Sequence, residues 1–188
     1  MLESARKIDG INWQLADAAI WQPERQYDLI FSNAALHWLD QHEQLLPRLA
    51  QALTPGGCLA IQMPRNFTSA SHSIAREVAR SGPWRETLAP VLREAPVHDA
   101  ADYYRILAPH AEQLDIWETE YLHVLKGDNP VADWTRGSLL VPLLAALAEP
   151  QRSAFEAEYR RRIQAAYPAQ ADAKTLFPFR RIFIVAMR

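Results

Sequence analysis

The polar side chains best placed for chemistry follow two short apolar runs of this chain. Asn33 follows Leu29-Ile-Phe31, and Arg65-Asn66 follow a second run at 59–63. If both runs are parallel strands of one open α/β sheet, these side chains lie at the carboxyl ends of the strands, where such sheets bind ligands. Amide and guanidinium groups orient a ligand by donating hydrogen bonds. The two runs therefore predict a binding site at this edge of the sheet.

The sequence shows no pattern typical of a metal site. Four histidines lie in different expected elements and lack the i, i+4 spacing or the cysteine partners of a zinc site. They are His72, His98, His110 and His123. The single Cys58 excludes an internal disulfide. Its place in an expected core strand predicts a small buried hydrophobic side chain rather than a nucleophile.

The two apolar runs predict parallel strands joined by a helix. Leu29–Phe31 and Leu59–Ile61 lack polar alternation, so we expect both strands to be fully buried. Between them, apolar residues recur at helical spacing and the Pro-Gly-Gly at 55–57 ends the helix; these residues are Leu45, Leu46, Leu49, Ala50 and Leu53. Pro47 should kink this helix or mark its true start.

The rest of the chain predicts further elements around this unit. Ile11 to Leu15 is a candidate third strand, and Asp99 is a candidate N-cap for a helix that ends near Pro109. Other patterns predict, in chain order, two short helices around 74–78 and 84–92, a strand over 115–125, a helix that begins at Pro130, a long helix after Pro150 and a strand over 179–187.

Composition indicates one globular domain with a moderate insertion. The chain has 188 residues, of which 49% are hydrophobic and 22% charged, with a net charge of -2. The absence of a basic excess argues against a nucleic-acid partner. The longest apolar run, Leu139 to Leu147, is interrupted by Pro142 and is far shorter than the roughly 20 residues that span a bilayer, so we expect no membrane partner.

Several motifs resemble the second half of a class I S-adenosylmethionine-dependent methyltransferase. In that fold an acidic residue follows the third strand, Asn ends the fourth and Pro-Gly-Gly precedes the fifth; this chain has Ala16-Asp17, Leu29 to Trp38, and Pro55 to Met63. Three further motifs narrow the resemblance to the trans-aconitate 2-methyltransferase family. They are Gln62-Met-Pro-Arg-Asn66, Asp115-Ile-Trp-Glu-Thr119 and Thr175 to Ala186, so the resemblance covers essentially the whole chain.

The resemblance implies an α/β fold: a partial class I methyltransferase (Rossmann-like) sheet with helical cap insertions and with its amino-terminal strands missing. Residues 1–65, with strands at about 114–125 and 179–188, would form the carboxyl half of the Rossmann-like core. Residues 66–112 and 126–176 would form a helical cap over the substrate site. Such a cap excludes water and orients the methyl acceptor.

The resemblance also implies that part of the family's cofactor site has no counterpart in this sequence. The first strand of the fold carries a glycine-rich loop, and the second ends in an acidic residue that binds ribose. Here the first glycine is Gly10, and Met1 to Lys7 resembles the middle of the family's second helix. We therefore expect a truncated chain; a misassigned start, a truncated gene and internal initiation stay open. The other possibility is a minimal protein that self-associates through its incomplete sheet.

For the cofactor, S-adenosyl-L-methionine, the resemblance implies two groups of residues. Asp17 would accept a hydrogen bond from the adenine amino group, and Ala18 would supply a backbone amide. Asn33, Ala34 and His37 would form the wall beside the methionine portion. Two simpler interpretations stay open: Asp17 as the N-cap of a short helical segment, and His37 as a core or rim histidine.

The resemblance implies a carboxylate acceptor, which is already ionised at neutral pH because model carboxyl pKa values are about 4. No catalytic base is then needed, and cations and donors should hold the substrate. The candidates are Arg65, Asn66, Arg136, Arg180 and Arg181. In an extended segment neighbours point to opposite faces, so at most one of Arg180 and Arg181 faces the substrate.

We therefore expect an S-adenosylmethionine-dependent O-methyltransferase in the cytoplasm that converts a carboxylate of a small polycarboxylic acid, first of all trans-aconitate, to a methyl ester. Leu139 to Pro142 departs from the family's Gly-Leu-Arg-Pro, which leaves the exact acid open. Two alternatives remain: another acyl acceptor such as a malonyl thioester, and an inactive remnant that acts only as an interaction module.

Overall fold

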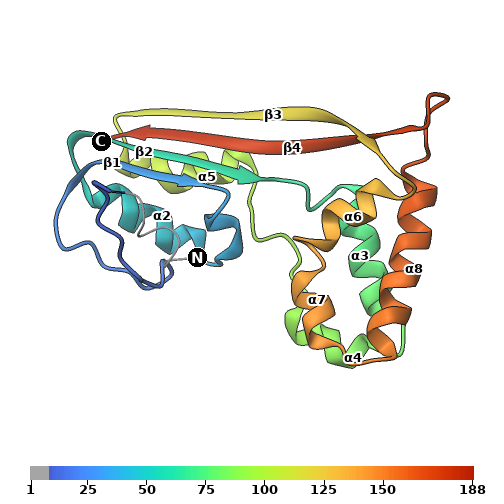
Figure 1. Ribbon diagram of the computed structural model, residues 1–188. Coiled ribbons are helices and arrows are strands. Elements are labelled where there is room, and N and C mark those ends of the chain that lie inside the picture. The colour runs from blue at the N-terminus through green and yellow to red at the C-terminus, as the bar shows by residue number, and fades with distance from the viewer. Residues whose placement is uncertain (1–8) are drawn as a thin grey trace.

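The computed structural model describes residues 9–188, so the helix expected over residues 1–7 lies outside the described part (Figure 1). The strands are β1 (Tyr27–Asn33), β2 (Leu53–Pro64), β3 (Gln113–Lys126) and β4 (Lys174–Met187). The α-helices are α2 (His42–Gln51), α3 (Ala70–Ser81), α4 (Arg85–Leu88), α5 (Ala100–Leu107), α6 (Pro130–Arg136), α7 (Val141–Ala146) and α8 (Gln151–Ala166). Short 3-10 helices are η1 (Leu36–Trp38), η2 (Ala89–Val91) and η3 (Ala108–His110).

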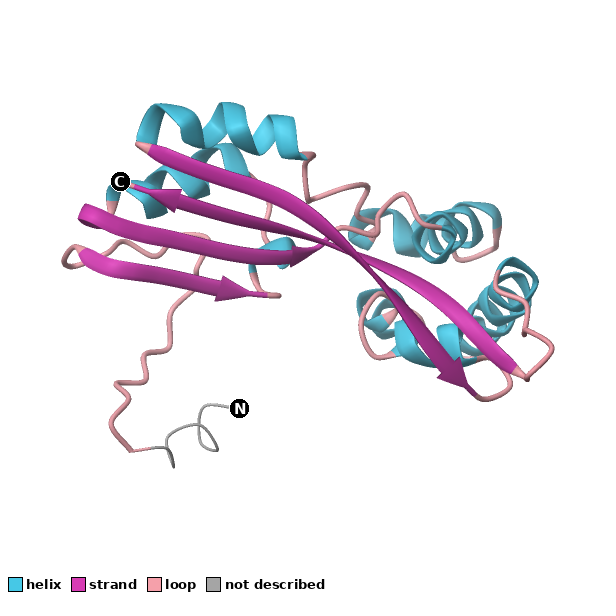
Figure 2. Cartoon of the chain, turned by 90° about the horizontal axis from the view of Figure 1, so that it is seen from above, coloured by secondary structure: helices cyan, strands magenta, loops and turns pink. Residues whose placement is uncertain are grey.

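The strands form one four-stranded sheet in the order β1-β2-β4-β3 (Figure 2). β1 and β2 are parallel and joined by α2, which confirms the predicted strand–helix–strand unit. β4 pairs with both β2 and β3 in antiparallel fashion. A mixed α/β sheet with β4 inserted beside the parallel pair is therefore the frame of the molecule.

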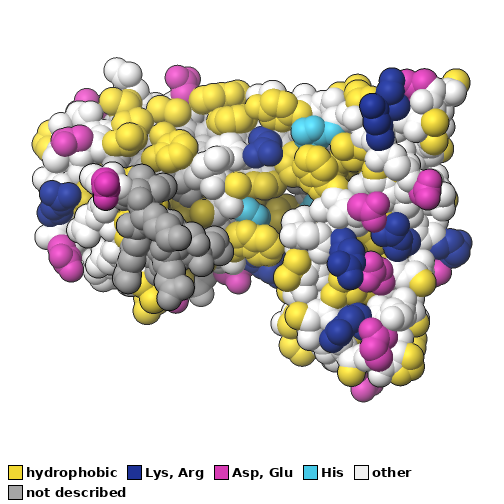
Figure 3. Space-filling model, viewed as in Figure 1, with side chains coloured by type: hydrophobic (Ala, Val, Ile, Leu, Met, Phe, Trp, Pro, Cys, Tyr) yellow, Lys and Arg dark blue, Asp and Glu magenta, His cyan; other side chains and the backbone are white. Residues whose placement is uncertain are grey.

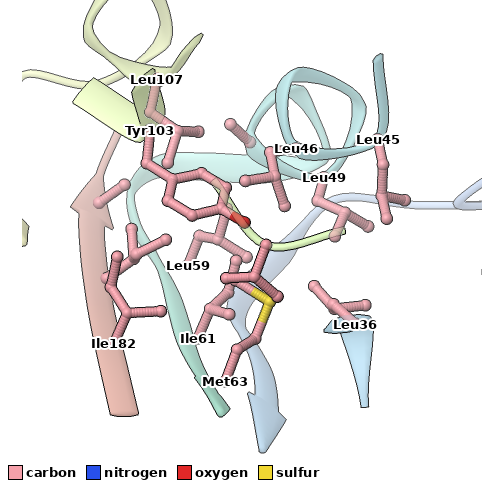
Figure 4. Packing of buried hydrophobic residues seen from close by; sticks show 14 of the residues in the cluster. Leu36, Leu45, Leu46, Leu49, Leu59, Ile61, Met63, Tyr103, Leu107 and Ile182 are labelled. Carbon is pink, nitrogen blue, oxygen red and sulfur yellow. The ribbon is translucent and has the colours of Figure 1, made fainter. Parts of the chain in front are cut away.

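Helices α2 and α5 lie against one face of this sheet (Figure 1). Between them, Leu46, Leu59, Ile61, Tyr103 and Ile182 belong to one cluster of buried side chains (Figure 4). At about 25 cal/mol per Å² of buried apolar surface, this cluster is the main source of stability for the sheet half. The core that positions the carboxyl ends of β1 and β2 is thus built on a single face.

The prediction that both strands are fully buried is wrong for β1 and holds for most of the second run, where Leu59 and Ile61 are buried and Ala60 is half-buried. Leu29 is 57% exposed and Phe31 is 69% exposed, and Cys58, the partner of Leu29 in the ladder, is half-buried. The reason is that, among residues 9–188, helices cover only the opposite face of β1 and β2 (Figure 2). Apolar runs without polar alternation are typical of strands that are covered on both faces. Here, among residues 9–188, helices cover β1 on one face only (Figure 2).

The predicted third strand over Ile11–Leu15 is also wrong. These residues have no regular structure, and Leu15 is 81% exposed. In the described residues the sheet ends at β1, which pairs only with β2. An apolar run becomes a strand only where a neighbouring strand takes up its backbone hydrogen bonds, and no strand of residues 9–188 does so here.

The helix between the parallel strands begins earlier than the proline suggests. α2 starts at His42 and contains Pro47, so Pro47 does not mark its start, and Leu53 belongs to β2. The helix ends before the Pro-Gly-Gly segment. Gly56 has φ +77°, and a Cβ on Gly57 would lie 2.9 Å from the Thr54 carbonyl oxygen. Both glycines are needed where the β1–β2 register shifts.

The other part of the molecule is a helical lobe, which lies where β3 ends and β4 begins (Figure 1). Its separate core joins α3, α6, α7 and α8 with the end of β4, through Val78, Val131, Leu143, Phe155 and Phe177. Helix starts at Pro130 and after Pro150 are confirmed. Among residues 9–188, no helix combines the length and apolarity that crossing a membrane requires.

Helix α5 lies with the sheet rather than with the helical lobe. Its predicted N-cap is confirmed, because the Asp99 carboxylate accepts a hydrogen bond from the Asp102 N–H at 2.8 Å. Tyr103 and Leu107 of α5 belong to the sheet core. The division of the chain into core and cap at 65, 112, 126 and 176 stays a prediction.

Replacing Tyr103 with Phe should destabilise the sheet core. The Tyr103 hydroxyl lies 2.7 Å from His42 Nδ1 and accepts from the His98 N–H at 3.2 Å. Because His42 Nε2 must donate to the Leu36 carbonyl, Nδ1 accepts from Tyr103. Tyr103→Phe leaves both groups unpartnered, and we expect a loss of about 2 kcal/mol in the free energy of unfolding, measured in urea.

Tyr104→Phe is the matched control for this change, because Tyr104 is the next residue of the same helix and is 58% exposed. Its unfolding free energy should stay within about 0.5 kcal/mol of the parent chain. Equal losses for the two variants would contradict a special role for the Tyr103 hydroxyl.

Candidate functional site

The loop after β1 is bent at the carboxyl edge of the sheet. Ala34 has φ +51°, which is sparsely populated for an alanine, and its N–H donates to the Gln62 carbonyl at 2.9 Å. Arg93 holds the next turn by donating to the carbonyls of His37 at 2.9 Å and Leu39 at 3.2 Å. Strain of this kind persists where the surrounding structure enforces it, often at functional sites. Asn33 and His37 are thereby placed on a rigid loop.

His37 is neutral in this loop. Burial lowers the pKa of its imidazole to about 4, with smaller contributions from the positive charge of Arg93 and from the neighbouring His42 imidazole. Its Nδ1 is buried and has no hydrogen-bond partner among residues 9–188. An unpartnered buried nitrogen is unfavourable by itself, so a ligand at this edge would relieve a real cost.

A cavity of about 130 Å³ lies between the carboxyl edge of the sheet and the helical lobe. Figure 3 shows the surface hollowed at this junction. Most of its wall is apolar or aromatic, and it includes Trp38, Phe67, Trp134, Phe177 and Phe179. Its polar lining comes from His37, Asn66, His72, Arg76, Arg93, Thr135 and Ser138. We call this the cap cavity; it has room for a small organic molecule.

A second cavity lies on the sheet itself and is lined by Asn33, Gln62, Tyr121, His123, Arg181 and Phe183. We call this the sheet cavity. The Arg181 guanidinium lies 5.1 Å from the centre of the Phe179 ring and 5.7 Å from that of Tyr121, and it donates to Gln62 Oε1 at 3.1 Å. Because the Phe179 ring that supports Arg181 also lines the cap cavity, the two cavities adjoin.

Among residues 9–188, the charged side chains that line the two cavities are basic. Within the described range 9–188, no Asp or Glu lines either of them, whereas three arginines do: Arg76, Arg93 and Arg181. Arg181 forms no ion pair with any described residue. Arg93 is paired with Asp40, so the positive potential of the combined site rests on Arg181 and Arg76, and in a largely apolar enclosure it favours a small anion.

The other predicted arginines are already paired with acidic side chains. Arg65 lies 2.8 Å from Glu118 and donates to the His98 carbonyl, Arg136 lies 2.7 Å from Glu156, and Arg180 lies 3.4 Å from Glu120. None of these three lines either cavity. Their assignment as substrate ligands stays a prediction that the geometry does not support, because each charge is compensated within the chain.

Asn66 lines the cap cavity but its side chain is used structurally. Its Oδ1 accepts from the Arg180 N–H at 2.7 Å, and its Nδ2 donates to the Arg180 carbonyl at 3.1 Å. These two bonds fix the segment after β2 to β4. The side chain is buried at 3% exposure, so it shapes the cavity wall more than it offers free donors.

Asp17 and Ala18 line neither cavity. The Asp17 carboxylate accepts from the Ala19 N–H at 2.9 Å and so stabilises a turn over residues 18–20 rather than the start of a helix. The Ala18 carbonyl accepts from Arg48 of α2 at 3.3 Å. The structure thus brings Asn33, His37 and Arg181 to one edge, but not the two residues expected at the adenine.

Sequence reasoning missed several residues of the two cavities. Gln62 carried a usable signal, since it is a polar residue inside the apolar run of β2. Arg76 and Arg93 carried none, because only the tertiary packing of the segments 70–81 and 92–99 turns them to the cavity. In residues 9–188, no three His, Cys, Asp or Glu side chains lie close enough together to hold a metal ion.

A family model and several solved structures match this chain. Residues 4–116 match a family model described as a methyltransferase domain. The YcgJ protein of Bacillus subtilis superposes with a TM-score of 0.56 at 11% identity, over all of this chain and 75% of that one. A putative methyltransferase from Bacillus halodurans gives 0.53 at 10% identity, over 99% and 75%.

The sequence is much closer to several named enzymes. A trans-aconitate 2-methyltransferase of Azoarcus sp. (strain BH72) is 47% identical over all of this chain and 74% of its own length. The proteins of that name from Paracidovorax citrulli and Yersinia pestis are 44% and 45% identical, over 74% and 73% of their lengths. The matched region of each relative covers nearly all of this chain. The chain belongs to the trans-aconitate 2-methyltransferase family of class I S-adenosylmethionine-dependent methyltransferases.

Proposed function

We propose that the protein methylates a carboxylate of a small polycarboxylic acid, with trans-aconitate as the substrate and a methyl ester as the product. The relatives described above carry that name. The observation that carries the proposal is the pair of adjoining cavities lined by Arg76, Arg93 and Arg181 and by no acidic side chain of residues 9–188. Guanidinium groups in an apolar enclosure select planar anions such as carboxylates.

Arg181 is the best placed of these groups to hold the carboxylate. Two aromatic rings and the Gln62 amide fix its guanidinium, while no described acid neutralises it. Asn33 lines the same cavity, at the carboxyl end of β1. A fixed, unpaired cation beside this strand end positions the acceptor with little loss of side-chain entropy.

The residues at the strand end fit the methionine side of the cofactor. S-adenosylmethionine supplies an electrophilic methyl group when it is bound. Asn33, the bent backbone at Ala34 and the unpartnered Nδ1 of His37 are the groups that would hold it. Because the His37 imidazole is neutral, it does not repel a cationic sulfonium.

The remaining steps need only orientation by this chain. The acceptor carboxylate is ionised at neutral pH, since carboxyl pKa values lie near about 4. Arg181 holds it, and the aromatic wall of the cap cavity excludes water. Alignment of a ready nucleophile with the methyl group accounts for the reaction without a catalytic base.

Other predictions from the sequence stay predictions. Neither a malonyl thioester acceptor nor an inactive interaction module gains a supporting observation from the relatives described here. Location in the cytoplasm also stays a prediction. Self-association through the incomplete sheet is supported by the exposed apolar side chains of Leu29 and Phe31, and light scattering on the purified chain tests it.

Arg181→Gln should weaken the use of trans-aconitate, because it removes the unpaired cation. We expect the KM for trans-aconitate to rise about tenfold or more, as loss of a charged hydrogen bond costs about 1.5–3 kcal/mol. The assay combines the chain with S-adenosylmethionine and trans-aconitate and quantifies the methyl ester by mass spectrometry.

Arg180→Gln is the neighbouring comparison, since Arg180 pairs with Glu118 and Glu120. Exposed ion pairs contribute little, so its KM should change less than about threefold. A larger loss in the Arg180 variant than in the Arg181 variant would reverse the assignment. Failure of the parent chain to form the ester with any polycarboxylate would refute the proposed function itself.

The rate should be independent of pH between about 6 and 9, because the acceptor carboxylate is ionised throughout that range. The pKa values of His37 and His72 are both lowered to about 4, so neither imidazole changes charge there. The measurement is kcat/KM for trans-aconitate across this range. A sigmoidal rise with an apparent pKa near about 6.5 would indicate a histidine base and contradict the mechanism.

A further inference from the structure

Helix α3 presents a polar pair to the cap cavity. His72 and Arg76 are four residues apart, and with Ala75 they line the cavity from the same side of the helix. The part of the wall that comes from α6, α7 and the segment between them includes Trp134, Leu139 and Leu143 and is apolar. A charged group facing such a wall is costly unless a ligand or a nearby acid compensates it.

The charge of Arg76 is poorly compensated within the chain. Its side chain is only 17% exposed. Its guanidinium donates to two backbone carbonyls, those of Phe67 at 2.7 Å and Glu94 at 3.4 Å. The acid that approaches it is Glu94, at 4.0 Å, whose other carboxylate oxygen is taken by Arg80 and which is 67% exposed. The carbonyls fix the position of the guanidinium without neutralising it.

The neighbouring His72 does not share or cancel this charge. Its Nδ1 lies 3.1 Å from the Ser71 hydroxyl and 3.3 Å from that of Ser69, and its ring meets Phe67 edge-on. Burial, and then the positive charge of Arg76, lower the pKa of the imidazole. At neutral pH the pair therefore carries one positive charge, located on Arg76.

We propose that Arg76 binds a second carboxylate of the substrate, remote from the one that is methylated, and so makes the enzyme select acids with more than one carboxylate. This inference rests on the proposed function. Arg181 and Arg76 line the two adjoining cavities: Phe179 lines the cap cavity, and its ring centre lies 5.1 Å from the Arg181 guanidinium of the sheet cavity. An acid with carboxylates at both ends satisfies both guanidinium groups, whereas a monocarboxylate leaves Arg76 unpaired in an apolar enclosure.

The test is the ratio of kcat/KM for trans-aconitate to that for crotonate, an unsaturated monocarboxylate, in the full chain and in Arg76→Gln. We expect the variant to lose about tenfold or more of this ratio, almost entirely through trans-aconitate. Calorimetric titration with trans-aconitate gives a second readout that does not depend on turnover, and its Kd should rise by a similar factor.

Arg80→Gln is the matched control, because Arg80 lies one turn further along α3, is exposed and does not line the cavity. Its ratio should stay within about twofold of the parent value. If the Gln variant does not fold, Arg76→Lys replaces it. Lysine keeps the positive charge but lacks the planar guanidinium that binds a carboxylate bidentately, so the trans-aconitate to crotonate ratio should fall about threefold or more.

An unchanged ratio and Kd in a folded Arg76 variant overturns the inference while leaving the methyltransferase function intact. Loss of crotonate and trans-aconitate turnover in equal measure also overturns it, since that result indicates a structural role. If the parent chain neither binds nor methylates trans-aconitate, the proposed function fails first, and this inference fails with it.

Discussion

The long antiparallel pair of β3 and β4 is the constraint on which the rest of the structure depends. β4 runs from the helical lobe into the sheet, and its alternation sends successive side chains to opposite sides. Ile182, Ile184 and Ala186 enter the sheet core. On the other side, Phe177 enters the lobe core, and Phe179 and Arg181 line the cap cavity and the sheet cavity. One strand thus joins both cores and carries the aromatic support and the cation of the site.

The register of that pair also decides which arginine is free. Arg180 pairs with Glu120 across the ladder and lies near Glu118, whereas Arg181 pairs with Thr119. A shift by one residue would exchange the roles of the two side chains, so that Arg180 would lie in the cavity and Arg181 beside the glutamates. Asn66 opposes such a shift, because it bonds both the N–H and the carbonyl of Arg180. The buried amide therefore contributes to the site by fixing the register, although its own donors are occupied.

Local signals in the sequence predicted much of the fold. Asp99 is an N-cap, helices begin at Pro130 and after Pro150, and two parallel strands enclose α2. These features depend on neighbours in the sequence or on one periodicity. The errors depend on partners that are remote in the sequence: within residues 9–188, the run at 11–15 has no strand to pair with, and the outer face of β1 has no covering layer.

The same distinction explains the candidate site. Arg65 follows β2 as expected, yet Glu118 of β3 neutralises it, and no periodicity of either strand reveals that pairing. Arg76 was missed because a solvated helix face and a cavity-lining face have the same composition until the lobe is assembled. The family itself was identified correctly, since its motifs are contiguous in the sequence. Contiguous motifs predicted the sheet edge. Which arginines there are paired with an acid, as Arg65 is, can be told only from the tertiary contacts.

Arg93 connects the two electrostatic requirements of the edge. The proposed reaction needs positive charge where the acid binds but a neutral surface where a cationic sulfonium would lie. The Arg93 guanidinium is directed at the carbonyls of His37 and Leu39 and at the Asp40 carboxylate, so much of its charge is taken up locally. What remains helps to lower the pKa of His37 and keeps that imidazole uncharged. The contact that fixes the loop therefore also helps to keep its histidine neutral, and this confines the free positive charge to Arg76 and Arg181 on the acid's side.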